Sequence, residues 1–436
     1  MDIWGQAKAA LDRAPTHTLR GLVTDVRGLI IEASGPAVGI GSNCSVVQGE
    51  LELRAQVVGF RKDCVLLMPL GDMHGIAPGA VVYSRGDSGK VLVGEELLGR
   101  VVDPLGIALD GKSVVSKGSE VSLFREPPSP LDRARIAECL DVGIKAVNTL
   151  LTIGKGQRVA IMAGSGVGKS TFLGMIAKHS VSDVNVIALV GERGREVREF
   201  IERDLGSEGM KRSVVVVATS DSSALLRVRA AFYATAIAEY FRDQGLSVNL
   251  LLDSVTRFCM AQREIGLAVG EPPSTNGYTP SVFAMLPRLM ERAGTSAGGG
   301  AITGFYTVLV EGDDMNEPIA DAVRGILDGH IILTRQLASR GHYPAIDILG
   351  SISRVMPDIV ESEQMGLARE VRRVWSDYTE VEDLITIGAY KQGQNPKVDY
   401  AVEHYELIRK FLVQFSEEHV DYATSMASLK AVFAKG

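Results

Sequence analysis

The sequence predicts a multidomain fold with an N-terminal all-β domain, a central α/β domain whose sheet is mostly parallel, and an α-helical C-terminal domain. Residues 19–90 hold short apolar runs separated by turn residues, residues 91–365 alternate strand-like and helical stretches, and the β pattern fades in residues 366–436. Each pattern is typical of the corresponding class of domain. The length of 436 residues allows two or three such domains.

Composition and charge limit the classes of function. With 46% hydrophobic and 23% charged residues the chain has the balance of an ordinary globular protein, and its net charge of −7 argues against a protein devoted to nucleic acid. The cysteines are scattered without metal-binding spacing, which indicates a reduced, intracellular protein and no metal-thiolate site. They are Cys44, Cys64, Cys139 and Cys259.

Residues 1–18 form the predicted N-terminal segment. Trp4, Ala7 and Leu11 are spaced as on one face of a small amphipathic helix, which is either a frayed terminus or a docking helix for a partner or membrane surface. The segment lacks the apolar core of a secretory signal. No apolar run in the sequence approaches the roughly 18 residues that a membrane span needs.

The N-terminal domain, residues 19–90, contains five short apolar runs, GLVTDV, LIIEA, AQVVGF, DCVLLMPL and AVVYS. Turn residues such as Ser-Gly-Pro and Pro-Gly separate them at intervals typical of a β-sandwich or small barrel. Residues 112–132 follow with Pro127, Pro128 and Pro130, which favours an extended linker at this point of the chain.

The central domain, residues 91–365, contains the strand-like runs RVAIMA, VNVIALV, SVVVVAT, VNLLLD, ITGFYTVLVE and HIILT. Helical stretches such as SALLRVRAAFYATAIAEYFRDQG lie between several of them, which predicts βαβ units and a parallel sheet covered on both faces. In residues 366–436, LAREVRRVWSDYTEVEDLI and VDYAVEHYELIRKFLVQF have the pattern of helices.

A glycine-rich loop, GSGVGKST, follows the run RVAIMA and precedes the helical FLGMIAKHS. In such a loop the backbone N–H groups bind phosphate, Lys169 reaches the β- and γ-phosphates, and the hydroxyl of Ser170 binds Mg²⁺. The motif departs from its usual form at Ala163, where a glycine is expected, and alanine fits if its φ is negative. The predicted phosphate-binding residues are Gly164, Ser165, Gly166, Val167, Gly168, Lys169, Ser170 and Thr171.

Two acidic residues end buried strands. Asp253 closes VNLLLD, where it either helps to hold hydrated Mg²⁺ or caps the next helix. Glu192 follows the apolar run VIALV and Gly191, and the carboxyl ends of parallel strands are where α/β proteins bind ligands. Its carboxylate can orient the water that attacks a γ-phosphate, and the competing interpretation is a solvated loop.

Several motifs together resemble a known family. GSGVGKST, VGERGREV, LLLDSVTRF, GEPPSTNGYTPSVFAMLPRLMERAG and HYPAIDILGSISRVM occur in the order found in catalytic subunits of rotary ATP synthases, and the chain is most similar to the type III secretion ATPases of flagellar or virulence systems. The resemblance covers nearly the whole chain. It implies a six-stranded N-terminal barrel, a RecA-like phosphate-loop ATPase domain, a helical C-terminal domain, and a ring of six subunits with nucleotide at the interfaces.

The resemblance also implies roles for individual residues, with ATP and Mg²⁺ as the bound species. Glu192 activates the attacking water, Asp253 acts at the magnesium, and the adjacent Arg193 belongs to the nucleotide site. Arg354, in SISR, enters the site of the neighbouring subunit, and Tyr343, in YPA, lines the adenine pocket. An arginine supplied in trans makes hydrolysis depend on assembly, and the competing interpretation of Arg354 is a structural ion pair.

Three functions compete, namely an export ATPase, most plausibly flagellar, a catalytic subunit of a rotary F/V-type ATPase, and a hexameric RNA translocase. Ala163, the GREVREF segment and GAYKQGQNP favour export. The aromatic residues of the N-terminal domain, Phe60 and Tyr83, are not interleaved with arginines, which argues against single-stranded RNA and nucleic acid as partners. A non-catalytic nucleotide-binding subunit is disfavoured because Glu192 is present.

For the export reading, the resemblance implies a homo-hexamer with several partners. The N-terminal segment contacts a stator-like regulator, a coiled-coil stalk enters the ring, and the C-terminal helices face substrate–chaperone complexes and a membrane export gate. The expected location is cytoplasmic, peripheral at the cytoplasmic face of the inner membrane. The sequence leaves open whether the apparatus is flagellar or of the virulence type.

Overall fold

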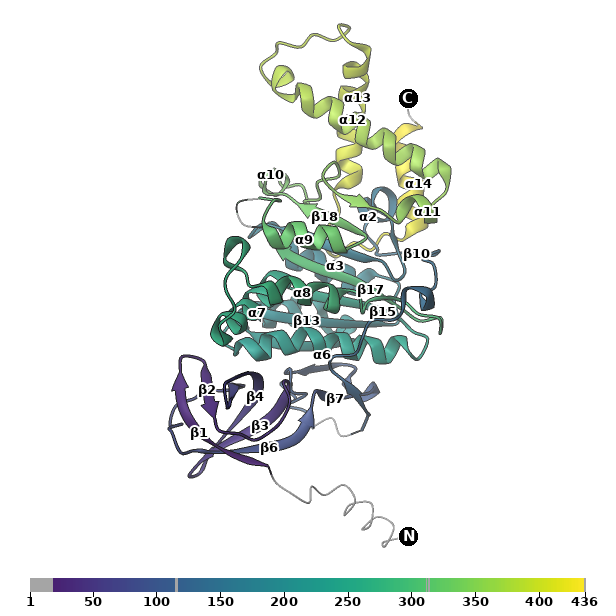
Figure 1. The fold of residues 1–436 in the computed structure, drawn as a ribbon. Coiled ribbons are helices and arrows are strands. Elements are labelled where there is room, and N and C mark those ends of the chain that lie inside the picture. Colours follow the sequence, from purple (N-terminus) through teal and green to yellow (C-terminus); the bar gives the residue numbers. More distant parts are fainter. Residues whose placement is uncertain (1–18, 114–116, 311, 313, 435–436) are drawn as a thin grey trace, which may run out of the picture.

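The computed structural model describes residues 19–113, 117–310, 312 and 314–434, which form three bodies stacked along one direction (Figure 1). A β-barrel lies at one end, an α/β body in the middle, and a helical body at the other end. This arrangement confirms the predicted three-part fold. The amphipathic helix expected in residues 1–18 lies outside the described residues. Within the described ranges, every helix is too short or too polar to span a bilayer.

The N-terminal barrel closes through six strands in the order β1-β2-β5-β4-β3-β6. Alternate residues such as Ile31, Val46 and Leu67 point into its core, as the period-two pattern predicts. Only β3, SNCSVVQ, has no counterpart among the predicted runs, and it is held by pairing with both β4 and β6. The strands are β1 (Arg20–Arg27), β2 (Ile30–Ala33), β3 (Ser42–Gln48), β4 (Leu51–Arg61), β5 (Cys64–Pro69) and β6 (Val81–Ser88).

The chain between the barrel and the α/β body is more ordered than the sequence predicts. β7 (Lys90–Val93) pairs with β9 (Ser119–Ser122) as a two-stranded antiparallel sheet, and β8 (Arg100–Val102) joins the edge of the central sheet. The predicted linker of residues 112–132 thus contains a short strand, β9, before its prolines. Its sequence, SEVS, has no apolar alternation, so pairing with β7 makes it a strand.

The central sheet has nine strands, with the order β19-β18-β12-β17-β15-β13-β14-β8 and β16 paired to β17. From β18 to β8 all neighbours are parallel, while β19 and β16 are antiparallel additions. These strands are β12 (Arg158–Ala163), β13 (Val184–Glu192), β14 (Ser213–Thr219), β15 (Ser247–Asp253), β16 (Gly294–Thr295), β17 (Ala301–Leu309), β18 (Gly329–Leu333) and β19 (Ile352–Ser353). A separate short pair is β10 (Cys139–Leu140) with β11 (Ile153–Gly154).

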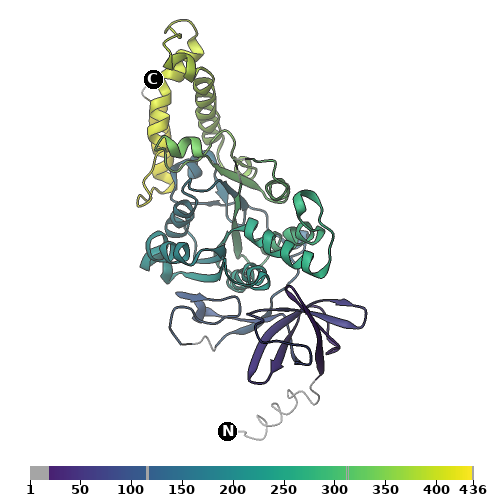
Figure 2. The same ribbon diagram turned by 90° about the vertical axis from the view of Figure 1, so that its left-hand side faces the viewer.

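Helices cover both faces of this sheet (Figure 2). Successive residues of β12 alternate between two apolar cores, one shared with α6 to α9 and the other with α3 and the helices near it. The first core is covered by α6 (Ala224–Arg242), α7 (Val255–Val269), α8 (Pro280–Met290) and α9 (Pro318–Ile326). The remaining helices of this body are α2 (Lys145–Leu150), α3 (Lys169–His179), α4 (Gly194–Glu199), a π-helix (Phe200–Leu205), α5 (Gly206–Lys211), α10 (Arg335–Ser339) and α11 (Met356–Ile359).

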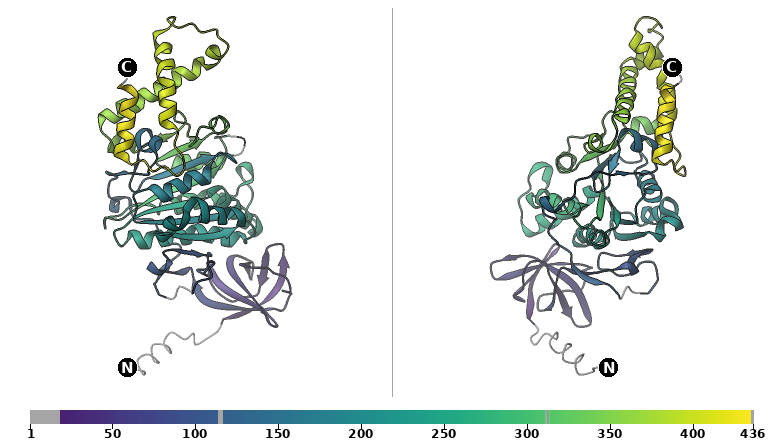
Figure 3. Two further views of the ribbon diagram at one scale, coloured as in Figure 1. Left: turned by 180° about the vertical axis from the view of Figure 1, so that it is seen from behind. Right: turned by 90° about the vertical axis from the view of Figure 1, so that its right-hand side faces the viewer.

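The C-terminal body consists of α12 (Ser362–Thr386), α13 (Pro396–Leu412) and α14 (Tyr422–Phe433). Helices α12 and α13 form a hairpin that projects away from the sheet, and α14 returns beside α2 (Figure 3). The connection between α13 and α14, residues 413–421, runs back to the α/β body. There the side-chain oxygen of Gln414 accepts a hydrogen bond from the backbone N–H of Lys145 at 2.9 Å. This return brings C-terminal residues next to α3.

A buried ion pair joins α6 to the turn after α8. Arg292 and Glu239 are 1% and 3% exposed, and two N–O distances of 2.9 and 2.6 Å make the pair bidentate. Arg292 also donates to the carbonyl of Leu123, next to β9, at 2.6 Å. The pair therefore ties the segment that follows the barrel to the α/β body.

Glu239→Ala should lower the free energy of unfolding by about 3–5 kcal/mol, because it leaves the Arg292 charge buried without its carboxylate. Urea denaturation followed by circular dichroism measures the change. Glu208→Ala, which removes an exposed ion pair with Lys211, is the control and should leave the midpoint nearly unchanged. Equal midpoints for the two variants would contradict the prediction.

Candidate functional site

The glycine-rich loop lies between β12 and α3 at the carboxyl edge of the sheet. Ala163 ends β12 and is not among the described residues with positive φ, so alanine is compatible with this position. Gly166 and Gly168 have φ of 78° and 92°, a left-handed conformation that favours glycine. Gly168 precedes the first residue of α3, Lys169, so the unpaired N–H groups of the helix start face the loop.

The loop borders a polar cavity of about 570 Å³. Ser165, Gly166 and Ser170 are exposed, whereas the side chain of Val167 is buried in the core beneath the loop. The described residues that line the cavity include every member of the predicted phosphate-binding set except Val167. A ring of backbone N–H groups at a helix start, with a lysine beside it, is suited to bind a phosphate-bearing anion.

Lys169 lies between two carboxylates. Its Nζ is 2.5 Å from Oδ1 of Asp253 and 3.5 Å from Oε1 of Glu192. Because β12, β15 and β13 are parallel members of one sheet, their carboxyl ends meet at one edge, and this brings the three residues together. Asp253 also accepts a hydrogen bond from Thr307 at 2.7 Å. The cap of α7 is Ser254, not Asp253.

Glu192 is 7% exposed, so its position is not that of a solvated loop. Its Oε1 lies 3.6 Å from Nε of Arg257, and neither atom has a hydrogen-bond partner among the described residues. Gly191, with φ of 72°, forms a bulge in β13 that turns the chain just before Glu192. A Cβ atom at Gly191 would lie 2.7 Å from Cδ of Arg257, so glycine also permits this close approach.

Burial and charge set the protonation of this cluster. The pKa of Glu192 is raised from 4.5 to about 7, because burial, the largest cause, and the nearby Asp253 together outweigh the opposing charges of Lys169 and Arg257. Burial alone would lower the pKa of Lys169, but Asp253 and Glu192 outweigh it and the pKa is raised. Lys169 is therefore charged at neutral pH, and Glu192 can take up and release a proton there.

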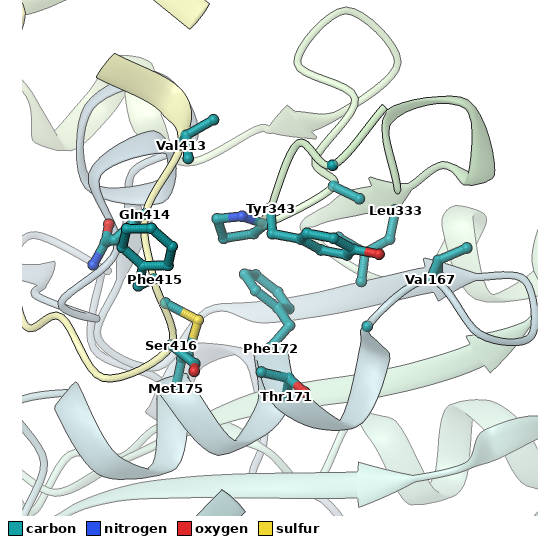
Figure 4. Close-up of a pocket in the computed structure, with 14 residues that line it drawn as sticks. Val167, Thr171, Phe172, Met175, Leu333, Tyr343, Val413, Gln414, Phe415 and Ser416 are labelled. Atoms are coloured by element: carbon teal, nitrogen blue, oxygen red, sulfur yellow. The ribbon is translucent and has the colours of Figure 1, made fainter. Parts of the chain in front are cut away.

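A second, mostly apolar cavity of about 320 Å³ adjoins the loop (Figure 4). Its lining shares Gly168 and Thr171 with the polar cavity. Tyr343, Phe172 and Phe415 place aromatic rings around it, and Tyr343 and Phe415 are 44% and 73% exposed. The two cavities together fit a ligand with a flat apolar group at one end and anionic groups at the other.

Gln414 lines the apolar cavity but is already engaged. Its amide nitrogen donates to the carbonyls of Gly143 and Glu418, both at 2.8 Å, and its oxygen accepts from the Lys145 backbone. Phe172 follows the phosphate loop directly, so the sequence could have indicated it. Phe415 carries no such signal, because only the return of the chain after α13 brings it to this cavity.

Arginines from several segments line the polar cavity. Arg193, predicted from the sequence, is the residue before α4, and its exposed guanidinium lies 3.6 Å from Glu196. Three more were not predicted, Arg203, Arg257 and Arg335. Arg335 also donates to the Ser165 carbonyl at 3.4 Å. These cations make the cavity suitable for a multiply charged anion.

Arg354 is the one predicted site residue that the structure does not bring to the loop. It follows β19, which pairs with the start of β18, and β18 runs parallel to β12. The start of β18 lies at the end of the strands opposite the loop. The guanidinium of Arg354 donates to the carbonyls of Leu327 and Arg324, both at 3.2 Å. Both of these partners are main-chain carbonyls, so the structural ion pair considered for Arg354 is not seen among the described residues.

Comparison with known proteins assigns families to all three bodies. The model for the nucleotide-binding domain of the ATP synthase alpha/beta family matches residues 143–353, and the model for the beta-barrel domain of that family matches residues 23–86. Residues 360–431 match the model for the T3SS EscN ATPase C-terminal domain.

Relatives match over nearly the full length. The flagellum-specific ATP synthase of Bacillus subtilis is 55% identical over 97% of both chains, and the type 3 secretion system ATPase of Xanthomonas euvesicatoria is 48% identical over 94% of this chain and 93% of its own. Two structures of assembled EscN from enteropathogenic E. coli are 46% and 45% identical, with TM-scores of 0.90 and 0.87. Each covers 94% of this chain and 99% of its own, and the second contains the central stalk EscO.

The pKa of Glu192 makes the stability of the ligand-free protein depend on pH. The folded state keeps a proton that the unfolded state releases between pH 4.5 and about 7, so the free energy of unfolding should fall as pH rises through this window. Glu192→Gln should remove that part of the dependence. Urea unfolding of both proteins at a series of pH values measures it, and a difference that does not change with pH would refute the expected proton uptake.

Proposed function

Because this chain belongs to the ATP synthase alpha/beta family, and within it to the flagellum-specific and type 3 secretion ATPases, we propose that it hydrolyses ATP to ADP and phosphate to drive type III protein export. The observation that carries the proposal is the position of Lys169. It is buried between Asp253 and Glu192 beside the phosphate loop. This geometry supports the proposal, because it brings a cation together with two carboxylates that would serve as the metal-binding acid and the base.

The two adjoining cavities support the placement of ATP. Its triphosphate would lie on residues 164–171, where Lys169 and Arg193 supply positive charge. Its adenine would lie in the apolar cavity between the rings of Tyr343 and Phe415. Stacking on these rings would hold the base, because the amide group of Gln414 is already engaged.

The residues present fit Mg²⁺. This ion is usually bound by one or two protein oxygens together with phosphate oxygens and waters. The exposed hydroxyl of Ser170 and the carboxylate of Asp253, the latter through water, would hold it. When bound, Mg²⁺ would neutralise charge on the phosphate oxygens.

Glu192 is positioned to act as the base. Its carboxylate would accept a hydrogen bond from the attacking water and then its proton, which a group with a pKa of about 7 can do near neutral pH. The burial that raises this pKa also keeps the carboxylate in one orientation. Holding the water in line with the γ-phosphorus is most of what hydrolysis requires from the protein.

Arg354 would complete the site of a neighbouring subunit. It lies at the amino ends of the parallel strands, whereas its own phosphate loop lies at their carboxyl ends, so it can reach such a loop only on another copy of the chain. A ring of six identical subunits would then hold complete sites at every interface. EscN, which is similar in fold over 94% of this chain, has been solved in an assembled form.

The export role includes further partners. By analogy with EscN bound to EscO, a central stalk would enter the ring. Residues 1–18 would contact a stator-like regulator, and the C-terminal helices would face substrate–chaperone complexes and the export gate at the cytoplasmic side of the inner membrane. The higher identity to a flagellum-specific relative favours the flagellar branch. The match of residues 360–431 favours export over a rotary synthase subunit, and over an RNA translocase.

Glu192→Gln should keep nucleotide binding and lower kcat roughly a thousandfold or more, because it removes the base but leaves the phosphate loop intact. Lys169→Ala should instead weaken both binding and hydrolysis. Phosphate release and binding of a fluorescent ATP analogue measure the two effects. Glu199→Gln, in the exposed ion pair with Arg195, is the control and should retain full activity. Normal turnover in Glu192→Gln would remove this residue from its role.

Mixing subunits should test the trans arrangement. Glu192→Gln and Arg354→Ala subunits should each be inactive alone, yet mixtures should recover activity at interfaces where an intact Glu192 meets an intact Arg354. The recovered rate should depend on the mixing ratio and be highest at intermediate ratios. If no ratio restores hydrolysis, Arg354 does not act across the interface.

A further inference from the structure

Main-chain carbonyls determine where the Arg354 guanidinium lies. α9 ends at Ile326, and the carbonyls of Arg324 and Leu327 belong to the group that an α-helix leaves without intrahelical partners at its end. Both accept hydrogen bonds from Arg354. The negative end of the α9 dipole also favours a cation there. Movement of this helix end would therefore move the arginine.

The same turn is held by a partly buried bidentate ion pair. Nε and Nη2 of Arg158 are each 3.0 Å from a carboxylate oxygen of Asp328, and the backbone N–H of Arg158 donates to the same carboxylate at 3.0 Å. Nη1 of Arg158 lies 2.5 Å from Glu291, on the turn after α8. Asp328 directly follows Leu327, so the pair fixes the residue next to a carbonyl that holds Arg354.

The main chain of Asp328 holds Arg354 as well. Its carbonyl accepts the backbone N–H of Arg354 at 3.0 Å and the side-chain amide of Gln157 at 3.1 Å. The same Gln157 nitrogen donates to Ser353, the residue before Arg354. Close packing of β18 and β19 adds to this, since a Cβ on Gly329 would lie 2.5 Å from the carbonyl oxygen of Ile352. Asp328 thus contacts the backbone of Arg354 and restrains its guanidinium.

We propose that Asp328, clamped by Arg158, is a positioning residue for the arginine that this chain supplies to its neighbour. This rests on the proposed trans role of Arg354. The ion pair acts through the Leu327–Asp328 turn and makes no contact with nucleotide in its own subunit. Loosening it would let the guanidinium move from its place, and a displacement on the order of 1 Å can lower a rate by up to about a hundredfold.

A purely structural role predicts a different outcome. Arg158 is the first residue of β12, the strand that ends at the chain's own phosphate loop. If the pair only supported β12, loss of Asp328 would damage the nucleotide site of the same chain. If it positions Arg354, the damage would appear in the site of the neighbour. Mixed rings separate the two.

The experiment uses full-length subunits mixed as above, in which Arg354→Ala chains supply the working nucleotide site and Glu192→Gln chains supply the working arginine. Asp328→Asn on the Glu192→Gln chain should lower the recovered kcat roughly tenfold with little change in KM for ATP, since the arginine is displaced but the phosphate loop is intact. The same substitution on the Arg354→Ala chain should leave the recovered rate unchanged.

Asp110→Asn is the matched control, because Asp110 forms a similarly buried bidentate pair with Arg100 at the far edge of the sheet, and it should have no effect on either chain. Arg158→Lys serves as a second variant, because lysine keeps the positive charge but cannot form the bidentate pair with Asp328. Like Asp328→Asn, it should lower the recovered kcat on the Glu192→Gln chain and leave it unchanged on the Arg354→Ala chain. Equal losses on both chains, a loss only on the Arg354→Ala chain, or none on either would overturn the proposal. Failure of the unmodified mixture to recover activity would instead refute the trans role itself.

Discussion

Lys169 between Asp253 and Glu192 is the interaction on which the rest of the site depends. A buried lysine would be unfavourable without opposite charge nearby, and two buried carboxylates would repel each other without the lysine. The parallel sheet brings the three side chains together at the carboxyl ends of its strands, where their charges stabilise one another. The positive charge of the lysine offsets part of the charge of the acids, and a bound phosphate group would compete with them for it.

The site also joins parts of the chain that are remote in sequence. The apolar cavity is formed by α3, by the segment around Tyr343 and by the connection between α13 and α14. The position of the C-terminal helices therefore affects the place where a flat ring would bind. Residues 413–416, which connect α13 to α14, line this cavity directly.

The proposed division of the site between subunits would have its origin in the sheet. Parallel strands gather ligand-binding groups at their carboxyl ends, whereas Arg354 lies beside the start of β18 at the opposite edge. Within a single chain, Glu192 and Arg354 thus lie at opposite ends of the strands. The turn at Leu327 and Asp328, where α9 ends, gives the arginine a defined position before any neighbour is present.

Several parts of this protein can be predicted from local patterns of residues. Residue spacing predicts the glycine loop before α3, the buried strands that end in Glu192 and Asp253, and the alternation of strands and helices. The family motifs add Tyr343 and Arg354 as candidate site residues. Strands such as β3 and β9, whose residues lack alternation, could not be predicted because partner strands stabilise them. Four features could not be predicted in this way: the burial of Glu192, its contact with Arg257, the position of Phe415 at the apolar cavity, and the ion pair between Arg158 and Asp328. Those features arise from contacts between residues far apart in the chain, and burial, which sets the pKa of Glu192, is a property of the packed molecule and not of a short segment.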